Sequence, residues 1–126
     1  AGDGSFFMNM NELSTIRKFN IPVIEMVFNN NVLGMVRQWQ RMFYEKRFSQ
    51  TILDRQTDFE KLAEAFGISY YRIEKKQDIK TVLKNAINEN APVLIECIID
   101  KDVNVLPMVP AGKTVEEPIL KIQIDD

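Results

Sequence analysis

Residues 93–99, with the sequence VLIECII, constrain the fold most, because all of them except Glu96 are apolar. A strand with one face in water alternates apolar and polar residues, whereas a nearly continuous apolar run is typical of a strand covered on both faces. Both faces are covered when helices pack on the two sides of a parallel sheet. The segment therefore predicts an α/β fold.

The remaining apolar residues follow spacings that predict helices and strands in alternation. Helices are expected at residues 5–19, 35–44, 57–66 and 78–90, and further strands at residues 23–28 and 68–73. Residues 45–56 are polar and aperiodic, so a loop is expected there. This order of elements predicts right-handed crossovers between parallel strands and a three-layer α/β sandwich with a mainly parallel sheet.

Local signals mark the ends of these helices. Thr57 and Glu60 match a capping box, in which the threonine hydroxyl and the glutamate each bond a free backbone amide. Gly67 is expected to end the helix that begins at this capping box, because glycine readily adopts the left-handed conformation. Asp78 is expected to cap the next helix and Asn90 to end it.

Composition narrows the classes of function. The 126 residues suit one domain with an apolar core, and a net charge of -2 argues against a broad nucleic-acid surface. No stretch approaches the roughly 20 apolar residues that cross a bilayer. After residue 100 prolines interrupt the chain, so residues 101–126 are expected to form an irregular tail of the same domain.

The chain has no histidine, which excludes a Ser-His-Asp, Cys-His or histidine–zinc site built from this polypeptide alone. Its single cysteine, Cys97, cannot form an intrachain disulfide, and a reducing cytoplasm is the expected compartment. Cys97 itself is expected to be a small buried apolar residue. Exposure at a sheet edge or a buried partner would each explain the neighbouring Glu96.

Two polar segments, GDGS at residues 2–5 and NNN at residues 29–31, follow apolar positions. If neighbouring parallel strands end at both places, Asp3 and Asn30 emerge side by side at the carboxyl edge, where open α/β sheets bind ligands. Their side-chain oxygens and a turn carbonyl such as that of Val32 suit a magnesium ion, with diphosphate oxygens and water completing an octahedron. Glycine amides and a helix N-terminus also favour a diphosphate.

Each segment has a simpler interpretation as well. An Asp-Gly sequence is common between a strand and a helix, and Asp3 can merely cap that helix. Asparagines are frequent in turns, so the second segment can be an ordinary polar turn. Trp39 follows Val36 by three residues, which is typical of a core stripe, whereas the arginines and glutamines around Trp39 favour a cleft or an interface.

Residues 2–6 and 29–30 resemble the thiamine-diphosphate motif, which runs from Gly-Asp-Gly to paired asparagines at the end of the next strand. Within that superfamily, other stretches are similar to the catalytic large subunit of acetohydroxyacid synthase, also called acetolactate synthase. They are LGMVRQWQ at 33–40, FY at 43–44, RFS at 47–49, DF at 58–59, KLAEAFG at 61–67 and VLPMVPAG at 105–112. The resemblance implies that residues 1–100 are the latter part of a C-terminal thiamine-diphosphate-binding domain of a longer protein.

The resemblance also implies roles for single residues. Asp3 and Asn30 match side-chain ligands of magnesium, and Val32 matches a ligand that binds through its backbone carbonyl. The residues expected to contact the cofactor are Gly2, Gly4, Ser5, Asn30, Gly34 and Met35. The substrate channel is expected to be lined by Val36, Trp39 and Ala111, with Trp39 favouring a larger second keto acid. No catalytic residue is expected in this segment, because the glutamate that activates the cofactor belongs to another domain across a dimer interface.

The activity implied is that of a transferase in branched-chain amino-acid biosynthesis, which decarboxylates pyruvate and condenses it with a second 2-keto acid. Its expected cofactors are thiamine diphosphate and magnesium, with FAD in the full-length enzyme. A cytoplasmic homodimer that includes the missing domains is expected, with a regulatory subunit left open and with neither a nucleic-acid nor a membrane partner. The polypeptide alone is expected to fold without synthase activity.

Two alternatives remain at this point. Another thiamine-diphosphate enzyme, such as a pyruvate oxidase or a 2-keto acid decarboxylase, shares the diphosphate motif, although the QWQ sequence at 38–40 and residues 107–112 argue against it. The other alternative is a non-catalytic flavodoxin-like interaction module, in which Asp3 and Asn30 are simple turn residues.

Overall fold

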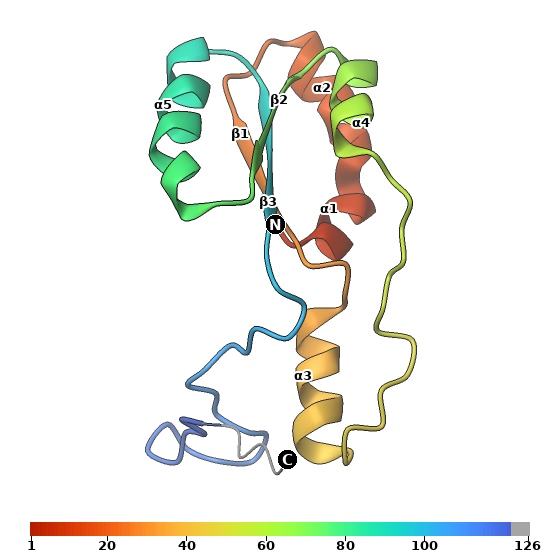
Figure 1. Ribbon diagram of the computed structural model, residues 1–126, viewed down its shortest axis with the longest axis vertical. Helices are drawn as coiled ribbons and strands as arrows, with labels where there is room; N and C mark the ends of the chain where they lie inside the picture. Colours follow the sequence, from red (N-terminus) through yellow and green to blue (C-terminus); the bar gives the residue numbers. More distant parts are fainter. Residues whose placement is uncertain (122–126) are drawn as a thin grey trace.

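The computed structural model describes residues 1–121, and it confirms an α/β fold with helices on both faces of a parallel sheet (Figure 1). The strands are β1 (Ile24–Asn29), β2 (Ser69–Ile73) and β3 (Val93–Ile98). The helices are α1 (Asp3–Asn9), α2 (Leu13–Lys18), α3 (Gly34–Phe43), α4 (Phe59–Phe66) and α5 (Ile79–Glu89), with short 3-10 turns η1 (Met10–Glu12) and η2 (Lys76–Asp78).

The sheet has the order β1-β3-β2, and all of its neighbouring strands are parallel. The nearly continuous apolar sequence of the central strand β3 is buried on both faces, as expected, because helices cover both sides of the sheet. Helices α1, α2 and α4 cover one face of the sheet and α5 covers the other (Figure 1). The prediction of a three-layer sandwich with a mainly parallel sheet is therefore confirmed.

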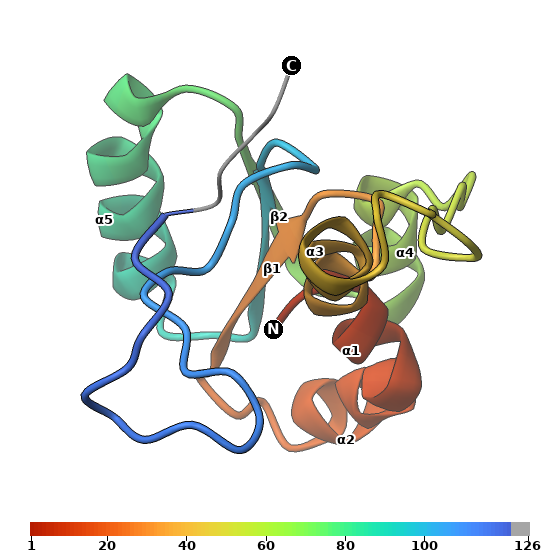
Figure 2. The ribbon, with the colours of Figure 1, turned by 90° about the horizontal axis from the view of Figure 1, so that it is seen from below.

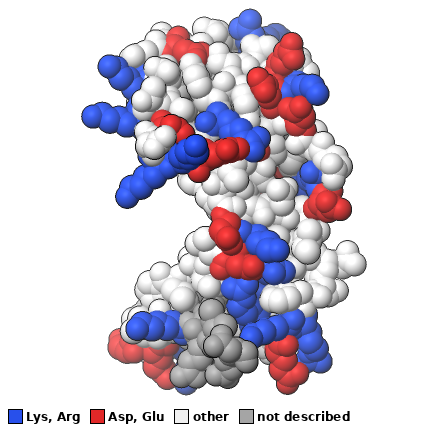
Figure 3. Space-filling view, viewed as in Figure 1, with Lys and Arg blue, Asp and Glu red and all other residues white. Residues whose placement is uncertain are grey.

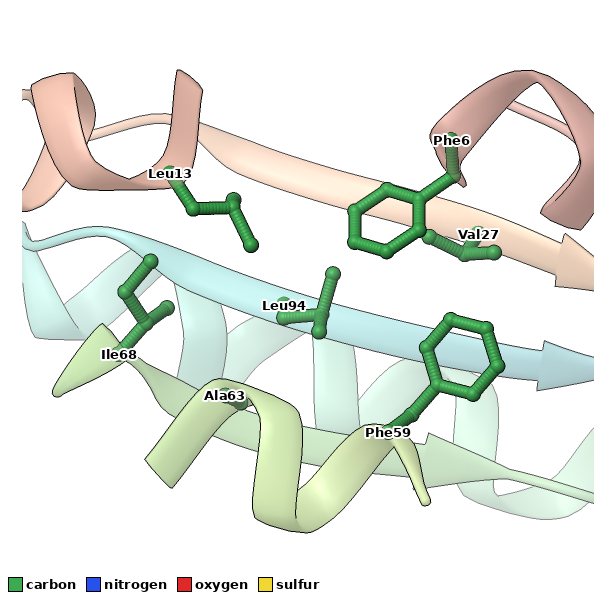
Figure 4. Packing of buried hydrophobic residues seen from close by; sticks show 7 residues of the cluster. All are labelled: Phe6, Leu13, Val27, Phe59, Ala63, Ile68 and Leu94. Carbon is green, nitrogen blue, oxygen red and sulfur yellow. The ribbon is translucent and has the colours of Figure 1, made fainter. Parts of the chain in front are cut away.

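The core is divided by the sheet into two apolar clusters. Leu94 is fully buried and points into the cluster under α1, α2 and α4, where it packs among Phe6, Val27 and Phe59 (Figure 4). Its neighbours in sequence, Val93 and Ile95, point to the opposite face. Alternation along a strand thus supplies a core to both helical layers.

Several element boundaries differ from the predictions. The helix expected at residues 5–19 is interrupted by η1, which divides it into α1 and α2. The cap of α4 is Asp58 rather than Thr57: the Asp58 side chain accepts a hydrogen bond from the Lys61 amide at 3.1 Å. The predicted capping box lies one residue too early, because threonine and aspartate both suit this role. Asp78 makes no side-chain cap bond, since η2 has already turned the chain into helical geometry.

Other boundaries agree with the sequence. Gly67 and Asn90 end α4 and α5 in the left-handed conformation, with φ of 68° and 48°. Residues 101–121 contain neither helix nor a strand longer than an isolated bridge, between Met108 and Ile119. The part of the expected tail beyond residue 121 lies outside the described residues.

Helix α3 stands apart from the layers, beyond the carboxyl ends of the strands. Figure 1 shows it below the sheet, and Figure 2 looks along its axis toward the strand ends. The first two residues run beside β1, where Gly2 forms a parallel bridge with Phe28 and the Phe28 amide donates to the Ala1 carbonyl at 2.8 Å. This pairing places the start of α1 next to the turn that follows β1.

The surface has a mixed charge distribution on the face drawn in Figure 3, where basic and acidic side chains are interspersed. None of the helices within residues 1–121 has the length and apolar character needed to cross a membrane.

Candidate functional site

A cavity of about 440 Å³ opens at the carboxyl end of β1, between the start of α1, the turn after β1 and the start of α3. Of the residues predicted from the sequence, nine line it: Gly2, Asp3, Gly4, Ser5, Asn30, Val32, Gly34, Met35 and Val36. The parallel pairing of Gly2 with Phe28 brings the two polar segments to one edge of the sheet. The residues predicted from the sequence to hold magnesium and a diphosphate thus line one cavity of the structure.

Asp3 is the acidic group of this cavity. Its residue is only 3% exposed, and burial raises the pKa of its carboxyl above the usual value, while the backbone amide of Gly4 and the charge of Arg55 oppose that rise. No side chain among residues 1–121 forms a salt bridge with it. A buried carboxylate without a salt bridge is suited to a bound cation, which would stabilise the charged form.

Asn30 and Val32 supply neutral oxygens beside Asp3. The Asn30 Oδ1 accepts a hydrogen bond from the Val32 amide at 3.2 Å, which closes the turn, and a carbonyl oxygen keeps a second lone pair for a metal. A Cβ on Gly34 would lie 3.2 Å from the Asn30 Nδ2, so a larger residue would push against the Asn30 side chain. The described residues contain no group of three or more acidic, cysteine or histidine side chains that could hold a metal ion by themselves, so a metal ion held here would rely on oxygens of its ligand.

These donors fit a magnesium ion that carries a diphosphate. One carboxylate, one carboxamide and a backbone carbonyl are hard oxygen ligands, and magnesium usually completes its shell with phosphate oxygens and water. Gly2 leaves room for a ligand, since no atom lies within 4 Å of a Cβ built on it. The residues that line this cavity therefore fit a magnesium ion with a diphosphate, which is the group that the sequence implies.

A second, larger cavity of about 670 Å³ adjoins the first along α3. It is lined by Met35, Val36, Trp39, Gln40, Tyr44 and Arg47, and Met35 and Val36 line both cavities. Trp39 is 40% exposed and packs edge-to-face on Phe43, with ring centroids 5.6 Å apart. Of the two interpretations of Trp39, the structure supports the cleft and not the core stripe.

Ala111 is not brought to either cavity. It lies exposed in a turn of the tail, and it is not among the residues that line the two cavities. The tail approaches the smaller cavity instead through Val103 and Val105.

The tail is fixed to α3 by a polar anchor. Arg37 donates to the Asp102 Oδ1 at 2.8 Å and Arg41 also binds this carboxylate. The Gln38 side chain binds both backbone groups of Val105. Its Oε1 accepts from the Val105 amide at 2.7 Å, and its Nε2 donates to the Val105 carbonyl at 3.1 Å. These contacts keep Val105 at the cavity.

Replacing Asp102 with asparagine is expected to loosen this anchor. Hydrogen bonding and charge from Arg37 hold the pKa of the Asp102 carboxyl below its usual range, so the ionised anchor stabilises the fold above that range and weakens only as the pH falls through the lowered pKa. At neutral pH, D102N should speed hydrogen exchange of the Val105 amide. Glu117→Gln, which breaks the exposed Lys113–Glu117 pair, is the control; equal exchange in both variants would contradict the anchor.

The sequence alone leaves open the role of Glu96, a carboxylate near the site. Glu96 is 4% exposed, and its carboxylate accepts hydrogen bonds from Asn29 and from the Tyr70 hydroxyl, each at 2.6 Å. Buried hydrogen-bond partners, and not exposure at a sheet edge, therefore account for Glu96. The signal in the sequence was a glutamate inside an apolar strand, but its partners come from two other strands and only the register identifies them.

Comparison with known proteins agrees with this geometry. The family model described as "Thiamine pyrophosphate enzyme, C-terminal TPP binding domain" matches residues 1–97. Among solved structures, the chain is similar to a thiamine diphosphate-dependent 4-hydroxybenzoylformate decarboxylase of Rhodococcus jostii RHA1, with a TM-score of 0.72 and 27% identity over 79% of this chain and 19% of that one.

Curated relatives have higher sequence identity. The mitochondrial acetolactate synthase of Schizosaccharomyces pombe is 44% identical over 119 residues, which are 94% of this chain and 18% of that protein. The large subunit of acetolactate synthase isozyme 2 of Escherichia coli is 40% identical over 122 residues, which are 97% of this chain and 22% of that subunit. The chain thus spans about a fifth of the length of the curated relatives it matches.

Proposed function

The chain belongs to the thiamine pyrophosphate enzymes, through their C-terminal TPP-binding domain, and we propose that it forms the magnesium- and diphosphate-binding part of an acetolactate synthase. The observation that carries the proposal is the single cavity in which Asp3, Asn30 and Val32 meet the glycines of the first segment. The identity of 40–44% to acetolactate synthases of two organisms supports this member of the family over an oxidase or a decarboxylase.

The chain's own residues divide the work between the two cavities. The Asp3 carboxylate, the Asn30 carboxamide and the Val32 carbonyl hold the divalent ion, and the diphosphate is bordered by the other lining residues Gly2, Gly4, Ser5 and Gly34. When bound, thiamine diphosphate supplies an electron sink for breaking and forming bonds at a carbonyl carbon.

The apolar wall beyond the diphosphate serves the substrates. Met35 and Val36 border both cavities and contribute apolar side chains to the wall between them. Trp39 borders the larger cavity, and in this proposal it contacts the second 2-keto acid. In this proposal the substrates are pyruvate and a second 2-keto acid of branched-chain amino-acid biosynthesis.

The remainder of the active site lies outside these residues. The group that activates the cofactor and the FAD site are assigned to other domains of a homodimeric enzyme. A cytoplasmic location is a further expectation, and a regulatory subunit is left open. Ala111 is assigned to the channel only in that complete assembly.

The proposal predicts that binding of thiamine diphosphate requires both magnesium and the diphosphate group. Titration followed by calorimetry and by Trp39 fluorescence should give saturable binding with magnesium present, and at least about tenfold weaker binding, a loss of about 1.4 kcal/mol, in EDTA. Thiamine without phosphate is the matched control and should bind no better in magnesium than in EDTA. Equal affinity for thiamine and thiamine diphosphate would refute the site. In the full-length enzyme, acetolactate formed from pyruvate tests the activity.

A further inference from the structure

A buried carboxylate lies directly behind the asparagine turn of the proposed metal site. Glu96 sits in the central strand β3, level with Val27 of β1 and Arg72 of β2. Its Oε1 accepts from the Asn29 Nδ2 and its Oε2 from the Tyr70 hydroxyl, each at 2.6 Å, and Arg72 lies 3.5 Å from Oε2. The carboxylate therefore links all three strands near their carboxyl ends.

This carboxylate determines the orientation of the Asn29 side chain. An ionised carboxylate can only accept hydrogen bonds, so it selects the NH₂ end of the Asn29 carboxamide. The opposite end, Oδ1, is then directed at the turn, where it accepts from the Asn31 amide at 3.2 Å. A side chain in the sheet thereby fixes a backbone group in the turn.

This bond supports the conformation of the turn. Asn31 has a φ of 55°, in the left-handed region, which asparagine tolerates better than most residues with a Cβ because its short polar side chain can hydrogen-bond locally. The Asn31 amide also acts to lower the pKa of the Asp3 carboxyl, against the larger effect of burial, which raises it. Asn30 and Val32 flank Asn31, so a shift at Asn31 would displace both of these ligand positions and one contact of Asp3.

We infer that Glu96 is a positioning residue for the metal site: through Asn29 it holds the turn that presents Asn30 and Val32 to the ion. The inference rests on the proposed function for its consequence, the metal affinity, and on the described contacts for its cause. A buried carboxylate that merely joins strands would contribute to stability and leave the metal site unchanged.

Two readouts on the purified full chain separate these possibilities. The first is hydrogen exchange of the Asn31 amide without ligand, with the Ile95 amide in the core of β3 as internal reference. The second is binding of Mn²⁺, a paramagnetic substitute for magnesium, in the presence of thiamine diphosphate and followed by electron paramagnetic resonance. Urea unfolding shows that each variant is folded.

Three variants give graded outcomes. Glu96→Gln keeps an acceptor oxygen for Asn29 and should leave Mn²⁺ affinity within about threefold, whereas Glu96→Leu should weaken it about 10- to 100-fold, as loss of partners behind metal ligands generally does. Asn29→Ala leaves Glu96 its bonds to Tyr70 and Arg72 and should match Glu96→Leu. Both should speed exchange at Asn31 about tenfold or more beyond any change at Ile95, whose exchange reports global stability.

The result that overturns the inference is Mn²⁺ affinity and Asn31 exchange unchanged in folded Glu96→Leu and Asn29→Ala. Failure of the proposed function looks different: the unmodified chain would bind no Mn²⁺ with thiamine diphosphate. In that case Asn31 exchange still decides whether Glu96 holds the turn, because that measurement uses no ligand.

Discussion

Asp3→Asn is expected to abolish magnesium-dependent binding of thiamine diphosphate. Asp3 is the acidic side chain of the cavity. Its replacement removes the negative charge that attracts a divalent cation. Loss of partners that merely support metal ligands costs about 10- to 100-fold in affinity, and loss of a charged ligand should reach or exceed the upper value, about 100-fold. Calorimetric titration with thiamine diphosphate and magnesium measures the effect.

The binding loss should occur without unfolding. Because burial raises the pKa of the Asp3 carboxyl, the folded chain holds this carboxylate in an environment that disfavours its charge. The neutral asparagine relieves that penalty, so D3N should unfold at no lower urea concentration than the unmodified chain at neutral pH.

Asp78→Asn is the matched control for this substitution. The change is the same in charge and size, Asp78 makes no side-chain cap bond, and it is absent from the residues that line the cavity. Full retention of magnesium-dependent binding in D3N would remove Asp3 from the metal site and leave it as a turn residue.

Leu94→Ala is expected to cause the largest loss of stability. Leu94 is completely buried at the centre of the sheet, in contact with the cluster formed by α1, α2, α4 and β1 (Figure 4). A leucine-to-alanine change at such a site typically costs about 3 kcal/mol, from lost transfer free energy and from the cavity left behind. The midpoint of urea unfolding should fall accordingly, and cofactor affinity should fall with the folded fraction.

Ile87→Ala on α5 removes an apolar side chain of comparable size from a residue that is 66% exposed. Its effect should stay within about 0.5 kcal/mol. Similar losses in both variants would mean that the sheet centre is not the main source of stability.

Much of the fold followed from local patterns. The run at residues 93–99 predicted a strand with two covered faces, and it is the central strand. Helix ends at Gly67 and Asn90 followed from the left-handed conformation these residues tolerate. Asp58 rather than Thr57 caps α4, because neighbouring residues with similar preferences compete and only the path of the backbone chooses between them.

The candidate site also follows from the sequence only as far as local patterns reach. The sequence by itself determined which polar residues follow β1 and begin α1, since strand ends and turns are encoded in a few adjacent residues. Hydrogen bonds between residues far apart in the chain, such as Asn29 with Glu96 and Asp102 with Arg37, depend on strand order and register. Only the tertiary structure decided them, because no local spacing reports which distant oxygen will meet a given donor.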